Sequence, residues 1–356
     1  MKTSKLLLSA SVLLFLASSC NKDDDPSPET PKVTTGVYVL NEGNFGGNNA
    51  SLSYYSLATK TATTDYFEKN NGYGLGDTGN DILLYGGKIY IVMNVTSTVE
   101  IADAFTAKSI RQLSFRQPGG ANREPRYAVP YKNKVFVSSY DGTVAVIDTT
   151  SLSIEKYITV GKNPDGMVIS GDKLYVSNSG GLTADFDSTI SVIDPVALTE
   201  LQKIKVGKNP GSITADNSGN LYVACAGNYY DINPSLVKVS TATNTVVKSA
   251  DTTVGRIRFY DGLLYVTGGY FGSPYLRTLN TTDFAQTRAN FVTDGTVVKV
   301  PYGISFDAEN GDIYVTDSKG FLESGEVFCF DKTGKKKFNF TVAPGIGPNN
   351  VVPIKQ

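Results

Sequence analysis

Residues 163–206 read NPDGMVISGDKLYVSNSGGLTADFDSTISVIDPVALTELQKIKV, and the order of their apolar and polar residues decides the fold. Four short segments in this stretch alternate apolar and polar residues and are rich in β-branched residues: 163–169, 173–176, 189–194 and 201–206. Gly171-Asp172 separates the first two segments, which is typical of a tight turn. The stretch therefore predicts one antiparallel sheet of four strands, which we call a, b, c and d in chain order.

The b segment carries an aromatic residue that recurs along the whole chain. Its copies are Tyr38, Tyr90, Phe136, Tyr175, Tyr222, Tyr265 and Tyr314. Their successive separations are 52, 46, 39, 47, 43 and 49 residues, with a mean of 46, which is the length of a four-stranded propeller blade. Since no segment shows a helical period, the sequence predicts an all-β fold. We expect residues 35–356 to form a seven-bladed β-propeller.

The two ends of the repeat predict how the ring closes. The first copy, residues 36–40, begins at strand b and has no a strand before it, whereas residues 348–354 resemble a spare a strand. Pairing of this last strand with the first blade would leave no open sheet edge. Within the blades, Asp148, Asp194 and Asp331 each close a c strand, where an Asp side chain can accept hydrogen bonds from amides of the next turn.

The first 34 residues have a different character. Lys2, Lys5 and the apolar stretch 6–16 precede Ala17-Ser18-Ser19-Cys20, which predicts a signal peptide over residues 1–19. The segment resembles a bacterial lipobox, which implies that Cys20 carries the lipid anchor; an ordinary secreted protein is the alternative. Residues 20–34 predict a disordered tether. The charged run 21–25 resembles the surface-export signal of Bacteroidetes lipoproteins, with a plain solvated run as the alternative. Together these features predict a protein anchored by lipid in the outer membrane and facing the cell exterior.

Composition excludes several classes of function. The 33 basic and 34 acidic residues leave no net positive charge to hold nucleic acid. The chain contains no histidine, which removes the nucleophile and zinc systems that depend on one. Cys225 and Cys329 fall in non-adjacent repeats, so we expect two free structural thiols. We predict that the protein is not an enzyme and uses no cofactor or bound metal.

Loop lengths indicate which face of the propeller is elaborated, because b-to-c and d-to-a connections share one face. The a-to-b turns are minimal, as at 86–87, 171–172 and 261–262, whereas five b-to-c loops are long: 41–49, 178–188, 226–234, 268–274 and 317–325. Long ordered loops on a rigid scaffold usually carry recognition. We therefore expect ligand binding on the b-to-c face.

Aromatic, amide and charged residues gather on these loops and at the starts of the a strands. The candidate ligand-binding residues are Asn41, Glu42, Asn44, Phe45, Asn80, Arg126, Tyr127, Asp165, Tyr229, Arg256, Tyr270, Phe271, Tyr302 and Asn349. Such a rim suits a bulky, uncharged ligand fringed with amides or hydroxyls. The alternative is that the aromatic residues pack between blades and the Asn residues serve loop conformation.

Two arginines leave two possibilities open. Arg126 and Arg256 begin a strands, so both are expected near the central channel, where a guanidinium can hold a phosphate or carboxylate through two hydrogen bonds. They could equally pair with Asp81 or Asp165 across the channel mouth.

Three short motifs indicate a family resemblance. They are Val-Gly-Lys-Asn-Pro at 160–164 and 206–210, Lys-Leu-Tyr-Val-Ser-Asn at 173–178 and Ile-Ser-Val-Ile-Asp-Pro at 190–195. These motifs resemble the YncE-like propeller family over residues 35–354. The opening Gly-Val-Tyr-Val-Leu-Asn-Glu-Gly-Asn-Phe at 36–45 is similar to a Bacteroidetes lipoprotein branch of that family. This resemblance implies capture of vitamin B12 or another corrinoid and its transfer to a TonB-dependent outer-membrane transporter.

The leading hypothesis is therefore a surface lipoprotein that captures a corrinoid. One alternative is a protein-interaction scaffold associated with a nutrient or glycan uptake system. The other is a calcium-dependent hydrolase of the lactonase type, for which Glu42, Asn80, Asn163, Asn209 and Asp165 would supply oxygen ligands. The blade count and residue spacing depart from the six-bladed hydrolases that use such a set.

Overall fold

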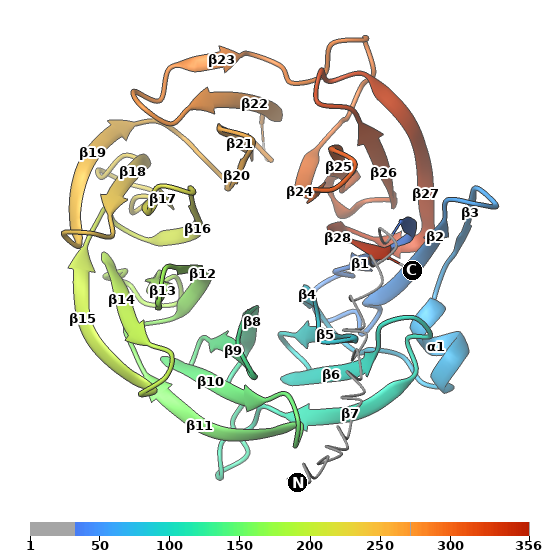
Figure 1. The fold of residues 1–356 in the computed structure, drawn as a ribbon, viewed down its shortest axis with the longest axis horizontal. Coiled ribbons are helices and arrows are strands. Elements are labelled where there is room, and N and C mark those ends of the chain that lie inside the picture. The colour runs from blue at the N-terminus through green and yellow to red at the C-terminus, as the bar shows by residue number, and fades with distance from the viewer. Residues whose placement is uncertain (1–32, 271, 356) are drawn as a thin grey trace, which may run out of the picture. The chain divides into compact units, whose positions relative to one another are not determined.

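The alternating segments of the repeat form antiparallel strands, and each set of four strands forms one sheet. In the computed structural model, which describes residues 33–270 and 272–355, seven such sheets stand around a common centre (Figure 1). The predicted all-β, seven-bladed β-propeller is confirmed.

Each blade runs from an inner strand beside the channel to an outer strand at the rim. From inner to outer strand, the first blade consists of β28 (Pro348–Lys355), β1 (Thr34–Asn41), β2 (Ser51–Ser56) and β3 (Thr61–Thr63). The second consists of β4 (Gly79–Tyr85), β5 (Lys88–Met93), β6 (Thr98–Asp103) and β7 (Ser109–Ser114). The third consists of β8 (Pro125–Tyr131), β9 (Lys134–Ser139), β10 (Thr143–Asp148) and β11 (Ser153–Thr159). The fourth and fifth are β12 (Pro164–Ser170), β13 (Lys173–Asn178), β14 (Thr189–Asp194), β15 (Thr199–Lys205); β16 (Pro210–Ala215), β17 (Asn220–Cys225), β18 (Ser235–Ser240), β19 (Thr245–Asp251). The last two are β20 (Arg256–Tyr260), β21 (Leu263–Gly268), β22 (Tyr275–Asn280), β23 (Gln286–Arg288); β24 (Pro301–Asp307), β25 (Asp312–Asp317), β26 (Ser324–Phe330), β27 (Lys336–Ile346).

The recurring aromatic residue lies on the second strand of every blade. All seven copies are at most 3% exposed, and each packs in a cluster of buried side chains between neighbouring strands and blades. The repeat is visible in the sequence because each blade needs one large side chain at this level to fill the space against the next blade.

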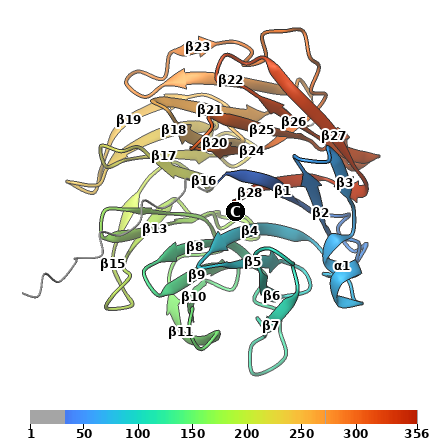
Figure 2. The same cartoon turned by 45° about the vertical axis from the view of Figure 1, so that its right-hand side comes forward.

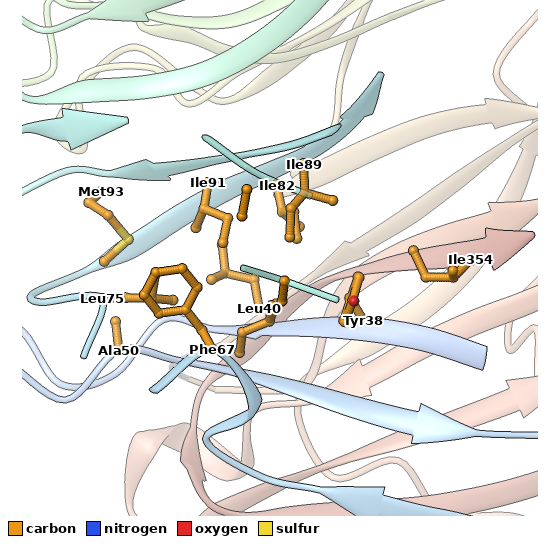
Figure 3. Close-up of a cluster of buried hydrophobic side chains, with 13 residues drawn as sticks. Tyr38, Leu40, Ala50, Phe67, Leu75, Ile82, Ile89, Ile91, Met93 and Ile354 are labelled. Carbon is orange, nitrogen blue, oxygen red and sulfur yellow. The ribbon is translucent and has the colours of Figure 1, made fainter. Parts of the chain in front are cut away.

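The ring closes as the ends predicted. β28 pairs antiparallel with β1, from Gly36 opposite Ile354 to Leu40 opposite Asn350. Figure 3 shows Ile354 beside Tyr38 in the cluster that joins the first and second blades. The last strand of the chain therefore supplies the inner strand of the first blade.

The turn aspartates also act as predicted. Asp148 accepts hydrogen bonds from the amides of Thr150 and Ser151, and Asp194 does the same for Val196 and Ala197. Asp331 follows β26 and accepts from Thr333 and Lys335. These carboxylates satisfy backbone donors in c-to-d turns on the face opposite the long loops.

Helix is present where the sequence predicted none. α1 (Tyr66–Asn71) lies beside β2 in the d-to-a connection of the first blade (Figures 1 and 2), and a 3-10 turn, η1 (Lys319–Phe321), lies in the b-to-c loop of the seventh. α1 has only six residues, too few for a helical period to be recognised, and only Phe67 of its side chains is buried. The expectation of a helix-free chain was wrong at these two short segments.

The two cysteines of the described chain are free and buried, Cys225 in the fifth blade and Cys329 in the seventh. Burial raises the pKa of Cys225 to about 12, so its thiol stays protonated at neutral pH. Both cysteines therefore serve as packing residues, as predicted.

One buried carboxylate makes a pH-dependent prediction. Glu100 on β6 is fully buried and accepts hydrogen bonds from Ser109 at 2.5 Å and Gln112 at 2.9 Å, and no cation pairs with it in the described residues. Burial raises its pKa above the ordinary value of 4.5. Because the folded protein binds this proton more tightly than the unfolded chain, the contribution of Glu100 to stability is fully present below the pKa of the unfolded chain. That contribution is lost as the pH rises through the pKa of the folded protein.

Glu100→Gln should therefore stabilise the protein at pH 7, because it removes a buried charge and keeps the hydrogen bonds with Ser109 and Gln112. We expect a gain on the order of 1 kcal/mol, or about 2–4 °C in Tm, that disappears as the pH falls below about 4. Thermal melts from pH 3.5 to 8 measure this difference, with the exposed Glu68→Gln as control. A Tm gain independent of pH would contradict the assignment.

Candidate functional site

The long loops gather on one face of the ring, which we call the loop face. It consists of the seven b-to-c loops and the d-to-a connections; the b-to-c loops are 42–50, 94–97, 140–142, 179–188, 226–234, 269–274 and 318–323. The five loops predicted to be long are the long ones, and those of the second and third blades are short. Exposed apolar tips also gather here: Phe45, Leu182, Tyr229, Tyr230 and Leu322 are 66–94% exposed.

The inner strands bring charged and polar side chains to the mouth of the central channel. Arg126 is the second residue of β8, and its Nε donates to Asp165 Oδ1 of the fourth blade at 3.0 Å. The Arg126 guanidinium also lies 4.6 Å from the centre of the Tyr140 ring. Burial alone would lower the pKa of Arg126, but the Asp165 carboxylate and the nearby tyrosines raise it. Of the two roles considered for Arg126, the structure therefore shows the ion pair with Asp165.

Arg256 is held differently. Its guanidinium stacks 4.0 Å from the centre of the Tyr302 ring and donates to the Asn349 carbonyl at 3.3 Å. No carboxylate of the described chain lies within salt-bridge distance of it. Arg256 therefore keeps donors free for an incoming acceptor.

Glu42, Tyr302 and Asn349 form a polar cluster at the same mouth. The Tyr302 hydroxyl donates to Glu42 Oε2 at 2.9 Å, and Asn349 Nδ2 donates to the carbonyls of Gly79 at 2.8 Å and Asn80 at 3.1 Å. Burial raises the pKa of Tyr302; the Arg256 charge lowers it and the Glu42 carboxylate raises it, and the net shift is upward, so Tyr302 remains a neutral phenol. Asn349 Oδ1 is buried and has no partner among the described residues.

Two adjoining hollows open beside the channel mouth over the third to sixth blades, and together we call them the loop-face cleft. The first, about 340 Å³, is lined by residues that include Tyr127, Tyr140, Asp165, Asn209, Tyr229 and Arg256. The second, about 440 Å³, is mainly apolar and is lined by residues that include Tyr229, Pro234, Val254 and Tyr270. The hollows share Ala226, Tyr229, Val254 and Gly255, so one ligand can extend across both.

Two groups of aromatic side chains in mutual contact include residues of this cleft. The Tyr229 ring lies edge-on to Phe186 at 5.7 Å, Tyr270 to Tyr302 at 5.3 Å, and Tyr302 to Phe321 at 5.4 Å between ring centres. Tyr229 adopts a left-handed backbone with φ of 60° and is 78% exposed. Its side chain therefore projects from the blade instead of filling the core.

The structure brings together part of the predicted site. Tyr127, Asp165, Tyr229, Arg256 and Tyr270 line the cleft, and Arg126 pairs with Asp165 at its edge. Glu42, Asn80, Tyr302 and Asn349 meet at the adjacent channel mouth.

Other predicted residues lie elsewhere. Asn44 and Phe45 are at the exposed tip of the first blade's loop, away from both hollows, and Asn41 is fully buried inside the first blade, where it donates to Ser51 and Ser53. Phe271 and Cys20 lie outside the described residues. Asn41 therefore joins adjacent strands of the first blade.

One charged residue was missed. Arg258 lines the central channel, two residues after Arg256 on β20. Side chains two residues apart point to the same side of a strand, so the Arg-Ile-Arg order at 256–258 was the signal that could have revealed it.

One of the oxygen ligands considered for a hydrolase, Asn163, is engaged in other hydrogen bonds. Asn163 Nδ2 donates to the Tyr140 carbonyl at 2.8 Å and its Oδ1 accepts from the Leu182 amide, so its amide is engaged within the loop face. Across residues 33–270 and 272–355, no group of three or more Asp, Glu, Cys or His side chains is placed to hold a metal ion. The same residues include no helix of the length and apolarity required to cross a membrane.

Comparison with known proteins adds a family and a fold. The sequence model of a family described as "Domain of unknown function (DUF5074)" matches residues 35–343. No curated protein matches the sequence. A solved structure from Bacteroides thetaiotaomicron, titled a quinonprotein alcohol dehydrogenase-like protein, is similar with a TM-score of 0.66 and 16% identity, covering 90% of this chain and 79% of that one.

Two further structures show the same architecture. A functionally unknown protein from Desulfotomaculum acetoxidans has a TM-score of 0.63 and 12% identity, covering 90% of this chain and 99% of that one. Hydrazine synthase from Kuenenia stuttgartiensis has a TM-score of 0.57 and 19% identity, covering 69% of this chain and 74% of that one. At these identities the likeness concerns the fold alone.

Proposed function

The chain belongs to the DUF5074 family, and we propose that this member is a surface lipoprotein that captures a corrinoid on its loop face and passes it to a TonB-dependent outer-membrane transporter. The lipid anchor at Cys20, the outer-membrane location and the transporter partner are parts of this proposal that rest on the N-terminal sequence and the family resemblance.

The observation that carries the proposal is the composition of the loop-face cleft. Its first hollow combines tyrosine rings with the Asn209 amide and the Arg256 guanidinium, and its second is mainly apolar. A corrinoid presents a flat macrocycle with amide side arms and a phosphate in its nucleotide arm. Tyrosine rings suit the flat surface, amides pair with amides, and an unpaired arginine suits the phosphate.

Equilibrium binding of cyanocobalamin to the chain from residue 21 onward tests the proposal. We expect saturable heat at micromolar protein in a calorimeter. Tyr229→Ala should weaken binding about tenfold or more, because Tyr229 lines both hollows and projects from the blade.

The adjacent Tyr230 provides a matched control. It is 94% exposed and lines neither hollow, so Tyr230→Ala should leave cyanocobalamin binding unchanged. Absence of binding heat for the unmodified protein, or equal effects of the two substitutions, would contradict corrinoid capture in this cleft.

A second candidate is a protein-interaction scaffold of an uptake system, and a specific observation favours it. Leu182, Tyr230 and Leu322 expose 66–94% of their side chains on loops of three different blades. Apolar tips of this kind on one face are typical of a protein-contact surface. Co-purification of a transporter without binding of any corrinoid would favour this second function.

A further inference from the structure

The inner strands of all seven blades surround a cavity of about 400 Å³ in the central channel. Seven of the lining residues carry polar side chains: Asp81, Tyr127, Ser212, Thr214, Arg258, Ser305 and Asn350. A cavity of this size has room for a small ion together with several water molecules.

Most of these polar groups are already used to join neighbouring blades. Ser212 Oγ accepts from the Ile257 amide, Thr214 Oγ1 from the Phe259 amide and Ser305 Oγ from the Val351 amide, each at 3.1 Å. These hydroxyls therefore hold the ring together.

The one carboxylate of the cavity is also engaged. Asp81 Oδ2 accepts from the Ala128 amide at 2.9 Å, and Asp81 Oδ1 accepts from Asn350 Nδ2 at 2.6 Å. Burial raises the pKa of Asp81, which weakens it further as a counter-charge. Asp81 therefore joins three blades, and it forms no salt bridge with a cation in the described residues.

Arg258 is the exception. Its guanidinium makes one hydrogen bond, to the carbonyl of its own neighbour Ile257 at 3.2 Å, and no carboxylate of the described residues lies within salt-bridge distance. Burial lowers the pKa of Arg258, and the Arg256 charge acts in the same direction, whereas Tyr127 and the Asp81 carboxylate act in the opposite direction. A guanidinium remains charged in a protein.

An unpaired charge inside a channel is costly, and a bound counter-ion offsets that cost. The free donors of a guanidinium match two oxygens of a phosphate or carboxylate. We propose that the central channel binds a small oxyanion, a phosphate or a carboxylate, on Arg258, with Arg256 adding positive charge from the mouth.

The oxyanion can come from two sources. The channel cavity and the first hollow of the loop-face cleft share Tyr127 and Ser212, so an anionic group of a ligand bound in the cleft can enter the channel. A free anion can reach the same position. Binding of a free anion does not depend on which ligand occupies the cleft, so this inference can hold or fail independently of corrinoid capture.

Thermal unfolding of the purified protein in inorganic phosphate, with chloride at equal ionic strength as reference, tests the proposal. We expect phosphate to raise Tm by about 5 °C at a hundredfold excess over Kd. Arg258→Met should melt at or above the temperature of the unmodified protein in chloride, because it removes an unpaired charge, and should lose the rise in phosphate. The control Arg111→Met, on the outer strand β7, should keep the rise.

Further outcomes decide whether the site exists and which anion occupies it. An equal phosphate effect in the unmodified protein and in Arg258→Met would overturn the proposal. Should Arg258→Met fail to fold, a crystal structure of the unmodified protein in phosphate decides: an anion on the Arg258 guanidinium supports the site, and a channel holding only water overturns it. Competition between phosphate and cyanocobalamin would assign the anion to the cleft ligand, whereas independent binding would assign it to a free anion.

Discussion

Removal of residues 348–356 is expected to abolish cooperative unfolding of the propeller. β28 is the inner strand of the first blade and pairs with β1 along six residues from Gly36 to Asn41. Its loss would expose the edge of β1 and remove the buried side chains of Val351 and Ile354 from two core clusters. It would also remove Asn350, which joins Ser305 of the seventh blade to Asp81 of the second.

The expected loss exceeds about 5 kcal/mol, since each large buried aliphatic side chain contributes about 2–5 kcal/mol and whole domains are stable by only about 5–15 kcal/mol. Circular dichroism melts and size-exclusion chromatography measure the effect. A synthetic peptide of residues 345–356 should restore the transition when added in trans, and the same peptide with Val351→Lys and Ile354→Lys should not. A truncated protein that melts within about 2 °C of the full chain would show that this strand does not close the ring.

The fold was predictable because its determinants are local and repeated. Each blade has one buried aromatic residue on its second strand, so the sequence contains this signal seven times. The spare strand at 348–354 was recognisable for the same reason, since the first repeat lacks its a strand. α1 escaped prediction because six residues with one buried side chain carry too little periodicity.

The site was predictable only to the level of a face. Loop length identified the loop face, and aromatic and amide residues on it pointed to Tyr127, Tyr229 and Tyr270. The pairing of side chains depends on how neighbouring blades are placed. Arg126 and Asp165 are 39 residues apart in the chain and meet because their inner strands are adjacent in the ring. Asn41 was predicted to bind ligand but is buried, and Arg258 was not predicted although it lines the channel. Strand position alone does not reveal whether a polar side chain has hydrogen-bond partners in the fold.

Two glycines, Gly166 and Gly303, lie where the backbones of neighbouring inner strands approach each other. Pro164-Asp165-Gly166 and Pro301-Tyr302-Gly303 share a Pro-x-Gly order, and in both strands the register shifts between the proline and the residue after the glycine. A Cβ on Gly166 would collide with the Gly211 carbonyl of the next inner strand, and a Cβ on Gly303 with the Asn349 carbonyl of β28. These glycines allow adjacent inner strands to approach closely around the channel.

Gly303→Ala is therefore expected to be strongly destabilising. The added methyl group would overlap the backbone carbonyl of Asn349, which rotation of a side chain cannot relieve, while the Gly303 amide is fixed by its hydrogen bond to Thr316 Oγ1 at 2.7 Å. β28 would have to move away from β24, and Asn349 would lose its contacts with Gly79 and Asn80 at the channel mouth. We expect a loss of about 3 kcal/mol or more, or a fall in Tm of roughly 6–12 °C.

Urea and thermal unfolding measure this loss, and Gly119→Ala is the matched control, because a Cβ there meets open space and the backbone is not left-handed. The glycine at 303 also tests how the closing strand and the loop face depend on each other. If β28 positions Asn349, Glu42 and Tyr302 as well as closing the ring, folded Gly303→Ala should bind cyanocobalamin more weakly than the unmodified protein at the same temperature. Stability equal to that of Gly119→Ala would mean that the inner strands do not approach as closely as Gly303 and Asn349 require.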